Sequence, residues 1–542
     1  AKERVYEHRV ETNRDLKKAA QVLNLFTDGS IGKNVLFREI KEKAFRILNR
    51  EKMEQVAAHI AAKAGFDEEA FRWDHIDRLG RQFKLYLRPV LSSVDFMGSP
   101  AQVPLIEAVN FLKGVFGKGR PISQYPVKKI PTRFIPSKVK RYLYNRHRLP
   151  VSDRYEFLIC RLLRDRLEAG DIFCPDSVRF RSFTDDLVGD RQWRQKDKLF
   201  DSTGLAILGQ PISEHLEALE HKFEGKIARV NRQIAAGENE YVCIRKQGGK
   251  VRWHLRYPPG REDVNHPFFD ALGQVNIASV MDFANRRCRF MDAFEHVLGR
   301  RARTVADNRI ITACLLAWGT NMGLGKMGQV SDISYNVLST ASDNFIRLET
   351  LREANDLISN AIAAMPVFRH YDTDGVVHSS SDGQKFETGI NTINARHSPK
   401  YFGLKKGVVA YTLVANHIPV NARIIGANEH ESHYVFDILF NNTSEIQPEV
   451  HSTDSHGTNE VNFAILHLFG YQFAPRYRDI YGKTKTSLYG FRHPSRYGDS
   501  LLVPVRKINK KLIMEGWEGI QRIMVSLALK TTTQSIIVGK LG

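Results

Sequence analysis

Residues 376–386 read Val-Val-His-Ser-Ser-Ser-Asp-Gly-Gln-Lys-Phe, one extended run that carries a single acid, Asp382. Two apolar runs follow it, residues 407–415 and residues 418–425, and only two residues separate them. Runs of this length, rich in β-branched residues and bounded by turn residues, are typical of β-strands. The three runs therefore predict three consecutive strands.

A second acid follows the next strand along the chain. Residues 429–441 predict a helix, residues 449–454 predict a short strand that ends at Asp454, and residues 459–468 predict a second helix. The complete order is strand, strand, strand, helix, strand, helix. It predicts an α/β unit whose first and fourth strands each carry an aspartate at or near the end.

Small residues surround both acids, so a large charged substrate and hydrated metal ions could approach the backbone there. Phosphoryl transfer from a phosphodiester needs two divalent ions about 3.5–4 Å apart. Magnesium prefers oxygen ligands and is usually held by one or two carboxylates together with substrate phosphates. A pair of aspartates on adjacent strands can bridge such an ion, which makes Asp382 and Asp454 candidate metal ligands. By spacing alone, however, Asp-Gly and Thr-Asp-Ser are also common turn sequences, so both interpretations stay open.

The charge of the whole chain points to a polyanionic partner. The 542 residues include 80 Lys and Arg against 60 Asp and Glu, a net charge of +20. Nucleic acid is the polyanion that we expect, because neutralising its phosphates releases counterions. No apolar run approaches the roughly 18 residues of a membrane helix. The five cysteines include no CxxC pair, which favours reduced thiols in a cytoplasmic protein.

Two short motifs fail as functional sites. Gly323–Gly328 matches GxGxxG, but the residues before it look helical rather than extended, so we interpret it as a turn between helices. His430-Glu431-Ser432-His433 has its histidines three residues apart, whereas a zinc protease helix needs four. We therefore expect neither a nucleotide site nor a structural zinc.

Longer motifs around both acids carry a specific resemblance. They are Ser380-Ser381-Asp382-Gly383-Gln384, Pro399-Lys400-Tyr401-Phe402-Gly403, Thr453-Asp454, Gly470-Tyr471-Gln472-Phe473-Ala474-Pro475-Arg476 and Gly323-Leu324-Gly325-Lys326-Met327. These motifs closely resemble the bacterial replicative transposases of the Tn-three family. The resemblance is firm over residues 305–480 and plausible over the first 300 residues.

The resemblance implies a mainly α, multidomain protein with an α/β, RNase-H-like catalytic domain of the DDE class near the C-terminus. It makes Asp382 and Asp454 the first two catalytic, metal-binding acids, with Mg²⁺ as the cofactor and Mn²⁺ as a substitute. Such enzymes nick the 3′ ends of a transposon and join them to target DNA, and replication then yields a cointegrate. The implied partners are transposon-end DNA, target DNA and a second copy in a homodimer, in the bacterial cytoplasm at the nucleoid.

The chain departs from the family pattern at the third acid. The family places a glutamate on a helix well beyond an insertion after the second aspartate, and no matching helix appears before Gly542. Glu515 and Glu518 lie in surroundings that do not match, and Glu460 would more simply stabilise a helix N-terminus. We therefore expect the chain to be an internal portion of a longer protein.

Periodicity, prolines and charge, together with the resemblance, divide the chain into regions. We predict a helical dimerisation or DNA-binding region (1–120), a basic, Pro-rich linker (121–150), a helical scaffold with a β-hairpin at 241–257 (151–370), the first part of the catalytic domain (371–470) and a basic insertion (471–542). The linker is either solvated or an arm laid along a DNA backbone.

Basic residues in these segments are candidate DNA contacts. They are Lys128, Lys129, Arg133, Lys138, Lys140, Arg141, Lys405, Lys406, Arg476, Arg478, Lys483, Lys485, Arg492 and Arg496. In the insertion the cations alternate with aromatic residues, which suits single-stranded or distorted DNA; packing beneath a solvated basic face is the alternative. Two other functions remain open: a non-catalytic DNA-binding scaffold, and a nuclease or resolvase that never joins strands.

Overall fold

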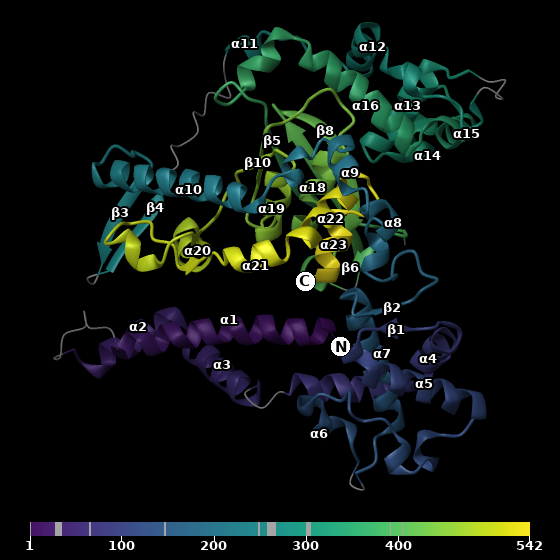
Figure 1. The fold of residues 1–542 in the computed structure, drawn as a ribbon, viewed down its shortest axis with the longest axis vertical. Coiled ribbons are helices and arrows are strands. Elements are labelled where there is room, and N and C mark those ends of the chain that lie inside the picture. Colours follow the sequence, from purple (N-terminus) through teal and green to yellow (C-terminus); the bar gives the residue numbers. More distant parts are fainter. Residues whose placement is uncertain are drawn as a thin grey trace.

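The computed structural model describes residues 2–27, 35–63, 67–145, 148–247, 250–256, 267–299, 305–390, 392–403 and 405–541. Helices make up most of the chain before residue 370, and a mixed sheet lies in the C-terminal part (Figure 1). The protein is thus mainly α, with an α/β region near its C-terminus. No helix among the described residues is long and apolar enough to cross a membrane.

The N-terminal part is a set of helices with its own apolar core. The helices are α1 (Lys2–Thr27), α2 (Phe37–Ile47), α3 (Arg50–Lys63), α4 (Glu68–Ser93), α5 (Val103–Lys118), α6 (Lys140–Leu143) and α7 (Ser152–Glu168), and β1 (Met97–Gly98) pairs with β2 (Ile172–Phe173). Between α5 and α6 the chain forms three short 3₁₀ turns, Ile122–Gln124, Val127–Lys129 and Ser137–Val139. Apolar side chains of residues 121–150, such as Ile122 and Leu143, are buried with Leu112 and Leu158 in this core. This Pro-rich segment therefore packs onto α5 and α7, while the cations among its described residues are exposed.

The middle of the chain continues as helices and one hairpin. Its helices are α8 (Asp190–Trp193), α9 (Lys196–Ser202), α10 (Ile212–Ala235), α11 (Pro267–Asp270), α12 (Ile277–Cys288), α13 (Asn308–Gly319), α14 (Gly323–Val330), α15 (Tyr335–Phe345) and α16 (Leu348–Ala363). Strands β3 (Val242–Gln247) and β4 (Lys250–Leu255) pair antiparallel. The glycine motif at 323–328 starts α14 and lies inside it, so our interpretation of it as a turn between helices was wrong.

The sheet is built around β5 (His378–Glu387). Its strand order is β10–β9–β5–β7–β6, and β8 also pairs with β7. The remaining strands are β6 (Arg396–His397), β7 (Lys406–Ala415), β8 (Ile418–Gly426), β9 (Val450–Thr453) and β10 (Gln472–Phe473). β5, β7 and β8 are antiparallel neighbours, whereas β9 runs parallel to β5 and β10 runs parallel to β9. Three antiparallel strands followed by two parallel ones are the arrangement of an RNase-H-like domain.

Helices cover the sheet and bury one face of it. They are α18 (Val435–Phe440), α19 (Glu460–Leu468), α22 (Trp517–Ala528) and α23 (Gln534–Leu541), while the short helix α17 (Pro399–Phe402) lies in the segment between β6 and β7. On β7 every second side chain is buried, including Val409, Tyr411 and Leu413, as expected for a strand that faces a core. The same core includes Val525 from α22 and Leu208 from the segment before α10. The C-terminal helices therefore tie the sheet to the helical middle of the chain.

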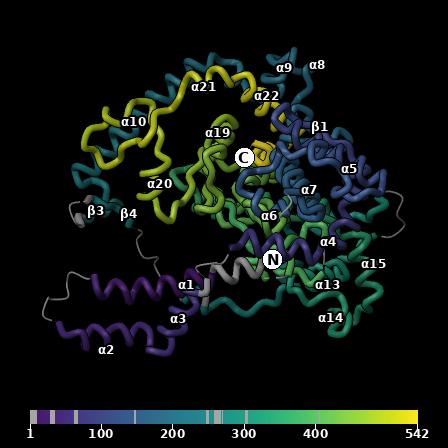
Figure 2. Tube along the Cα trace, turned by 90° about the horizontal axis from the view of Figure 1, so that it is seen from below, coloured from purple at the N-terminus to yellow at the C-terminus, as the bar shows by residue number. Residues whose placement is uncertain are grey.

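The insertion folds back along the helical scaffold. It holds α20 (Ile480–Ser487), a parallel pair of β11 (Tyr489–Gly490) and β12 (Arg506–Lys507), and α21 (Lys510–Glu515). α21 lies beside α10 (Figures 1 and 2), and Lys510 of α21 forms an ion pair with Glu220 of α10. The insertion thus has an ordered hydrogen-bonded framework on this side of the molecule.

The predicted helix at 429–441 is only half present. A 3₁₀ turn at Glu431–His433 precedes the shorter helix α18. The carbonyl oxygen of Ser432 accepts hydrogen bonds from the side-chain amides of Asn459, Asn462 and Gln534. These three long-range bonds hold the backbone of Ser432 in place, and local helix propensity yields to them.

Candidate active site

The strand register brings the two predicted acids together. Ser381 of β5 pairs with Thr453 of β9, so Asp382 and Asp454 are each one residue beyond the same pair. Neighbouring strands lie about 4.8 Å apart. Two carboxylates separated by roughly seventy positions in the sequence thus meet at one end of the β5–β9 pair.

Both carboxylates project from the open face of the sheet. Ser379 and Ser381 are buried on β5, and His451 and Thr453 are buried on β9. Because side chains alternate between the two faces of a strand, Asp382 points away from the core, and both acids are exposed. This is the position that a large polyanionic substrate can reach.

Asp454 is held as a carboxylate by the turn that follows it. Its Oδ1 accepts hydrogen bonds from the backbone N–H groups of His456 (2.8 Å) and Gly457 (3.1 Å), and its Oδ2 lies 3.0 Å from Nδ1 of His456. Burial would raise the pKa of Asp454, but these hydrogen bonds to its charged form outweigh burial and lower the pKa below its ordinary value. Asp454 is therefore ionised at neutral pH and fixed in orientation.

A buried polar network supports the two acids from the opposite face of the sheet, the face that is packed against the core. The ring of His451 lies between two serine hydroxyls, with Nδ1 2.8 Å from Ser379 Oγ and Nε2 2.9 Å from Ser381 Oγ. Ser381 Oγ is also 2.6 Å from the hydroxyl of Tyr411 on β7. The network thus joins three adjacent strands directly beneath Asp382 and Asp454. Its polar atoms are buried and pair with one another, which fixes the strands relative to one another.

The buried histidine predicts a loss of stability in acid. Burial, together with the nearby His378, lowers the pKa of His451 to about 3, so the folded protein keeps the ring neutral. The unfolded chain takes up that proton below pH ~6.5, so stability is complete above this pH and falls as the pH drops toward 3. From pH 7 to pH 5 we expect this group to remove about 2 kcal/mol of unfolding free energy. Urea unfolding, with hydrogen exchange reporting on β5 and β9, measures this loss.

The variant His451→Gln separates this group from other titrations. Glutamine keeps one donor and one acceptor near the serines but does not titrate. The unfolding free energy of the variant should therefore depend less steeply on pH between 7 and 5 than that of the wild type. His370→Gln changes an exposed histidine in the same way and should keep the wild-type pH dependence. Equal pH slopes in the wild type and in His451→Gln would show that His451 is not responsible.

Two arginines lie next to Asp454. The chain after β10 continues alongside β9, with the backbone N–H of Arg476 donating to Thr453 O (2.7 Å). The backbone N–H of Arg478 donates to the hydroxyl of Ser455 (2.9 Å). Both arginine side chains are exposed. The backbone thus places two cations beside the acid pair, where the phosphates of a bound strand would lie.

The other predicted DNA contacts lie in three parts of the chain. The insertion that follows Arg478 holds Lys483, Lys485, Arg492 and Arg496. The N-terminal helical part holds Lys128, Lys129, Arg133, Lys138, Lys140 and Arg141, and the start of β7 holds Lys405 and Lys406. Lys406 and Lys483 are half-buried, and the others are exposed. Some of these cations form ion pairs within the chain, such as Lys405 with Glu387 (2.6 Å) and Lys483 with Glu460 (3.5 Å). The insertion cations thus lie near α10 and the start of α19, where Arg492 is 3.8 Å from Glu224 and Lys483 is 3.5 Å from Glu460.

None of the three glutamates weighed as a third acid joins the pair. Glu460 faces Lys483, Glu515 faces Lys511 at 3.7 Å, and Glu518 accepts a hydrogen bond from the Trp193 indole at 3.1 Å. All three are exposed and engaged elsewhere.

Sequence reasoning missed a glutamate that does lie beside the site. Glu431 is buried, its Oε1 is 3.0 Å from Lys385 Nζ, and its carboxylate packs against Gly383, the residue after Asp382. Lys385 in turn lies over the ring of Tyr401, 4.7 Å from its centre. Glu431 belongs to the His-Glu-Ser-His motif that fails as a zinc site, and no sequence signal pairs it with β5. On the face of the sheet that is packed against the core, it supports the strand that carries Asp382.

The acid pair has the donor chemistry of a magnesium site. Among the described residues, no group of three or more His, Cys, Asp or Glu side chains could hold a metal ion by itself. Two exposed carboxylates at one strand end offer hard oxygen donors, which suit Mg²⁺ or Mn²⁺ rather than zinc. Magnesium commonly takes its other ligands from water and substrate phosphates. The residues present therefore fit a divalent cation that binds together with a phosphodiester.

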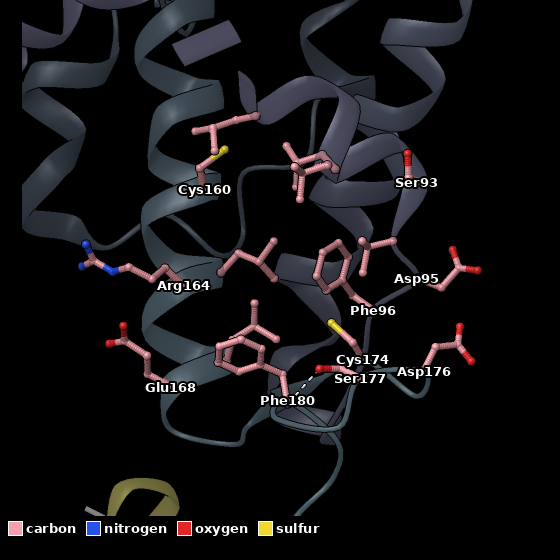
Figure 3. Close-up of a pocket in the computed structure, with 16 residues that line it drawn as sticks. Ser93, Asp95, Phe96, Cys160, Arg164, Glu168, Cys174, Asp176, Ser177 and Phe180 are labelled. Atoms are coloured by element: carbon pink, nitrogen blue, oxygen red, sulfur yellow. Dashed lines mark hydrogen bonds between the residues drawn. The ribbon is translucent and has the colours of Figure 1, made fainter. Parts of the chain in front are cut away.

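A separate hollow lies far along the chain from these acids, between α4 and α7. It encloses about 500 Å³ and is lined mainly by apolar side chains, with Cys160 and Cys174 pointing inward and charged groups such as Arg164 and Glu168 at its rim (Figure 3). Burial raises the pKa of Cys160 to about 12 and also raises that of Cys174. Both thiols stay protonated and are poor nucleophiles. All five cysteines are free thiols, as the sequence predicts.

The sheet order, with one acid on the central strand and one after its parallel neighbour, defines an RNase-H-like domain of the DDE class. Residues 279–542 match the family described as the Tn3 transposase DDE domain. This part of the chain therefore resembles the Tn3-family transposases, the Tn-three family of the sequence motifs. A domain of this class implies the use of divalent metal ions.

Curated relatives resemble the chain well beyond this domain. The transposase for transposon Tn1546 of Enterococcus faecium is 26% identical over 489 residues, which cover 87% of this chain and 47% of the relative. The transposase for transposon Tn2501 of Escherichia coli is 28% identical over 463 residues, or 84% of this chain and 45% of the relative. The transposase for transposon gamma-delta of Escherichia coli (strain K12) is 23% identical over 496 residues, 88% and 48% of the two chains. The chain spans about half the length of these relatives.

Proposed function

We propose that this chain is the central and catalytic portion of a replicative transposase. Its substrates would be transposon-end DNA and target DNA, and Asp382 and Asp454 would be its first two metal-binding acids. The observation that carries the proposal is the meeting of these acids beyond one residue pair of β5 and β9, with Arg476 and Arg478 beside them. The family match and the net charge of +20 support it.

The proposed reaction consists of two in-line displacements at phosphorus. In the first, a water oxygen bonds to phosphorus at the transposon end while the bond from phosphorus to the 3′ oxygen breaks, leaving a 3′-OH. In the second, that 3′-OH oxygen bonds to a target phosphorus and displaces a target 3′ oxygen. Magnesium held by Asp382 and Asp454 would help to activate the attacking oxygen and stabilise the leaving one, with manganese as a substitute.

The residues of this chain would orient the substrate for both steps. The backbone N–H groups of His456 and Gly457 keep Asp454 ionised and aimed at the open face. Arg476 and Arg478 would bind phosphates on either side of the scissile bond, because guanidinium groups match phosphate geometry. The buried network around His451 would keep the two acids in register during both steps.

Strand joining distinguishes this function from its alternatives. Full-length protein is incubated with Mg²⁺, a transposon end that already carries a free 3′-OH, and a supercoiled target plasmid. A transposase covalently joins the end to the plasmid, a simple nuclease or resolvase cuts without joining, and a DNA-binding scaffold does neither. Absence of joined product under conditions that support end binding would contradict the proposal.

The cations beside the acids predict a salt-dependent effect. Replacing Arg476 or Arg478 with alanine should weaken DNA binding regardless of sequence and flatten the slope of log affinity against log salt by about one unit per lost phosphate contact. Replacing Lys128 or Lys129 should act in the same way if the N-terminal segment also follows the backbone. Fluorescence anisotropy between 50 and 300 mM salt gives each slope.

Arg309→Ala is the matched control, because Arg309 on α13 is exposed and lies outside both basic segments. Its slope should equal that of the wild type. An unchanged slope in the Arg476 and Arg478 variants would assign these side chains to a solvated surface instead.

We also propose a twofold-symmetric homodimer in the bacterial cytoplasm, associated with the nucleoid through DNA. The helical regions before residue 370 would supply most of its interface. Support comes from α12, where Ile277, Val280 and Phe283 are all at least half exposed. An apolar helix face of this kind is typical of a surface that another chain covers.

A further inference from the structure

A cavity of about 1000 Å³ lies between α10, the β3–β4 hairpin, α20 and residues 492–501. Its lining combines three kinds of side chain. The apolar side chains are Ile227, Ala228, Ile244 and Val251, and the aromatic ones are Trp253, Tyr481 and Tyr497. The cationic side chains are Arg232, Lys485, Arg492 and Arg496. A ligand that fits all three has a flat apolar body and a negative charge.

Trp253 supplies an unused hydrogen-bond donor in this cavity. The side chain is only 6% exposed, and within the described part of the chain its indole N–H has no hydrogen-bond partner. Leaving such a donor unsatisfied costs about 1–3 kcal/mol. The ring is held in place by Tyr481, which meets it edge-on with the ring centres 6.0 Å apart and donates its hydroxyl to Val251 O (3.3 Å). The Trp253 ring thus belongs to the cavity wall and carries an unsatisfied hydrogen-bond donor.

The charge of the cavity remains positive after its internal pairs are counted. Glu224 accepts a hydrogen bond from the Tyr497 hydroxyl (2.6 Å) and lies 3.8 Å from Arg492 Nε. Arg232, Lys485 and Arg496 are exposed and have no carboxylate within ion-pair distance among the residues that the structure describes. Asp499 is the other acid in the lining, so cations outnumber acids there.

Helix α20 connects this cavity to the acid pair. The segment that leads into α20 is hydrogen-bonded to Ser455, the residue after Asp454, through the Arg478 backbone. On α20 itself, Lys483 faces Glu460 at the start of α19, while Tyr481 and Lys485 line the cavity. A DNA strand that leaves Asp454 and crosses α20 would therefore reach the opening of the cavity.

We propose that this cavity binds one unpaired nucleotide of the DNA strand that passes Asp454. The aromatic side chains contact its base, the Trp253 N–H donates to an acceptor on that base, and Lys485, Arg492 and Arg496 bind its phosphate. Stacking of a base on aromatic side chains tolerates any sequence, so the pocket recognises an unstacked nucleotide rather than a particular base. The inference rests on the proposed function and adds to it a site for distorted DNA outside the acid pair.

The test compares two labelled probes by fluorescence anisotropy on the full chain. One is a fluorescein-labelled 12-mer of thymidine, and the other has the same backbone with an abasic unit at every position. We expect the chain to bind the thymidine probe at least about tenfold more tightly, the range for stacking of one base on aromatic side chains. Tyr481→Ala should reduce this ratio toward one without changing affinity for the abasic probe. Trp253→Phe, which keeps a ring but removes the donor, should reduce it in part.

Tyr335→Ala on α15 is the matched control, because Tyr335 is an exposed tyrosine outside the cavity, and its ratio should remain that of the wild type. A second measurement does not depend on any variant: ultraviolet crosslinking of a 5-iodouracil probe should attach it to Tyr481, Trp253 or Tyr497.

Equal affinity for the two probes, or crosslinks confined to other elements, would contradict the proposal that this cavity binds a nucleotide. Neither result would contradict DNA binding by the chain. If neither probe nor a duplex transposon end binds, the proposed function fails together with the pocket. If the duplex end binds while neither single strand does, only the pocket fails.

Discussion

Asp382→Asn and Asp454→Asn should each abolish Mg²⁺-dependent nicking of a transposon end by the full-length protein. Asparagine preserves the size of the side chain but removes the negative charge that holds a hard cation. At position 454 the amide oxygen can still accept the hydrogen bonds from His456 and Gly457, so the turn should survive. We expect a loss of more than about 10²-fold, the scale seen when one preorganised electrostatic group is removed from an enzyme active site.

End-labelled DNA on denaturing gels measures the nicking, and gel shift measures end binding, which should stay near the wild-type level. Asp374→Asn is the matched control. It changes an exposed aspartate in the turn before β5, at a positive φ of 53° that asparagine tolerates well. Near-wild-type nicking by either of the two active-site variants would remove that residue from the site.

Gly383→Ala should also remove most of the activity, although residue 383 has no chemical role. A methyl group there would lie 2.5 Å from the Glu431 carboxylate and 2.7 Å from Cγ1 of Val409. Val409 is fully buried and Glu431 is paired with Lys385, so neither can yield freely. Strand β5 would shift instead and carry Asp382 with it. A displacement of about 1 Å at a reacting group can reduce the rate about 10²-fold.

Overpacking of this kind also lowers the free energy of unfolding by about 1–3 kcal/mol. Gly389→Ala is the control, because its added methyl group meets open space just beyond the same strand. It should nick DNA at the wild-type rate and unfold at the wild-type urea concentration. If Gly383→Ala retained full activity, the close packing of Glu431 under Asp382 would be irrelevant to the reaction.

The sequence predicts the strands of the catalytic region well, because alternation and β-branched residues are local signals. The strands at 378–387, 406–415, 418–426 and 450–453 and the helix at 460–468 agree with prediction to within a few residues. Their pairing order does not follow from local signals. Only the register of β5 with β9 shows that Asp382 and Asp454 are neighbours, and the family resemblance anticipated this.

Features that depend on distant contacts could not be predicted. The helix expected at 429–441 is shortened by hydrogen bonds from the side chains of Asn459, Asn462 and Gln534 to the carbonyl oxygen of Ser432. No sequence pattern near Ser432 predicts these bonds. Glu431 is close to Gly383 only because the sheet folds that way. The burial of Ile122 and Leu143 likewise reflects packing on α5 and α7, whereas the prolines and cations around them dominate the local pattern.

The parallel pairing of β5 with β9 makes the acid pair a late product of folding. The β7–β8 hairpin closes over a short turn, a local event on the microsecond timescale. Pairing β5 with β9 must close a loop of roughly seventy residues, which is entropically less favourable and slower. During synthesis at about 5–20 residues per second, Asp382 leaves the ribosome several seconds before its partner does. A nascent chain therefore carries no paired acids until β9 has been made and docked, and the proposed metal site cannot form before then.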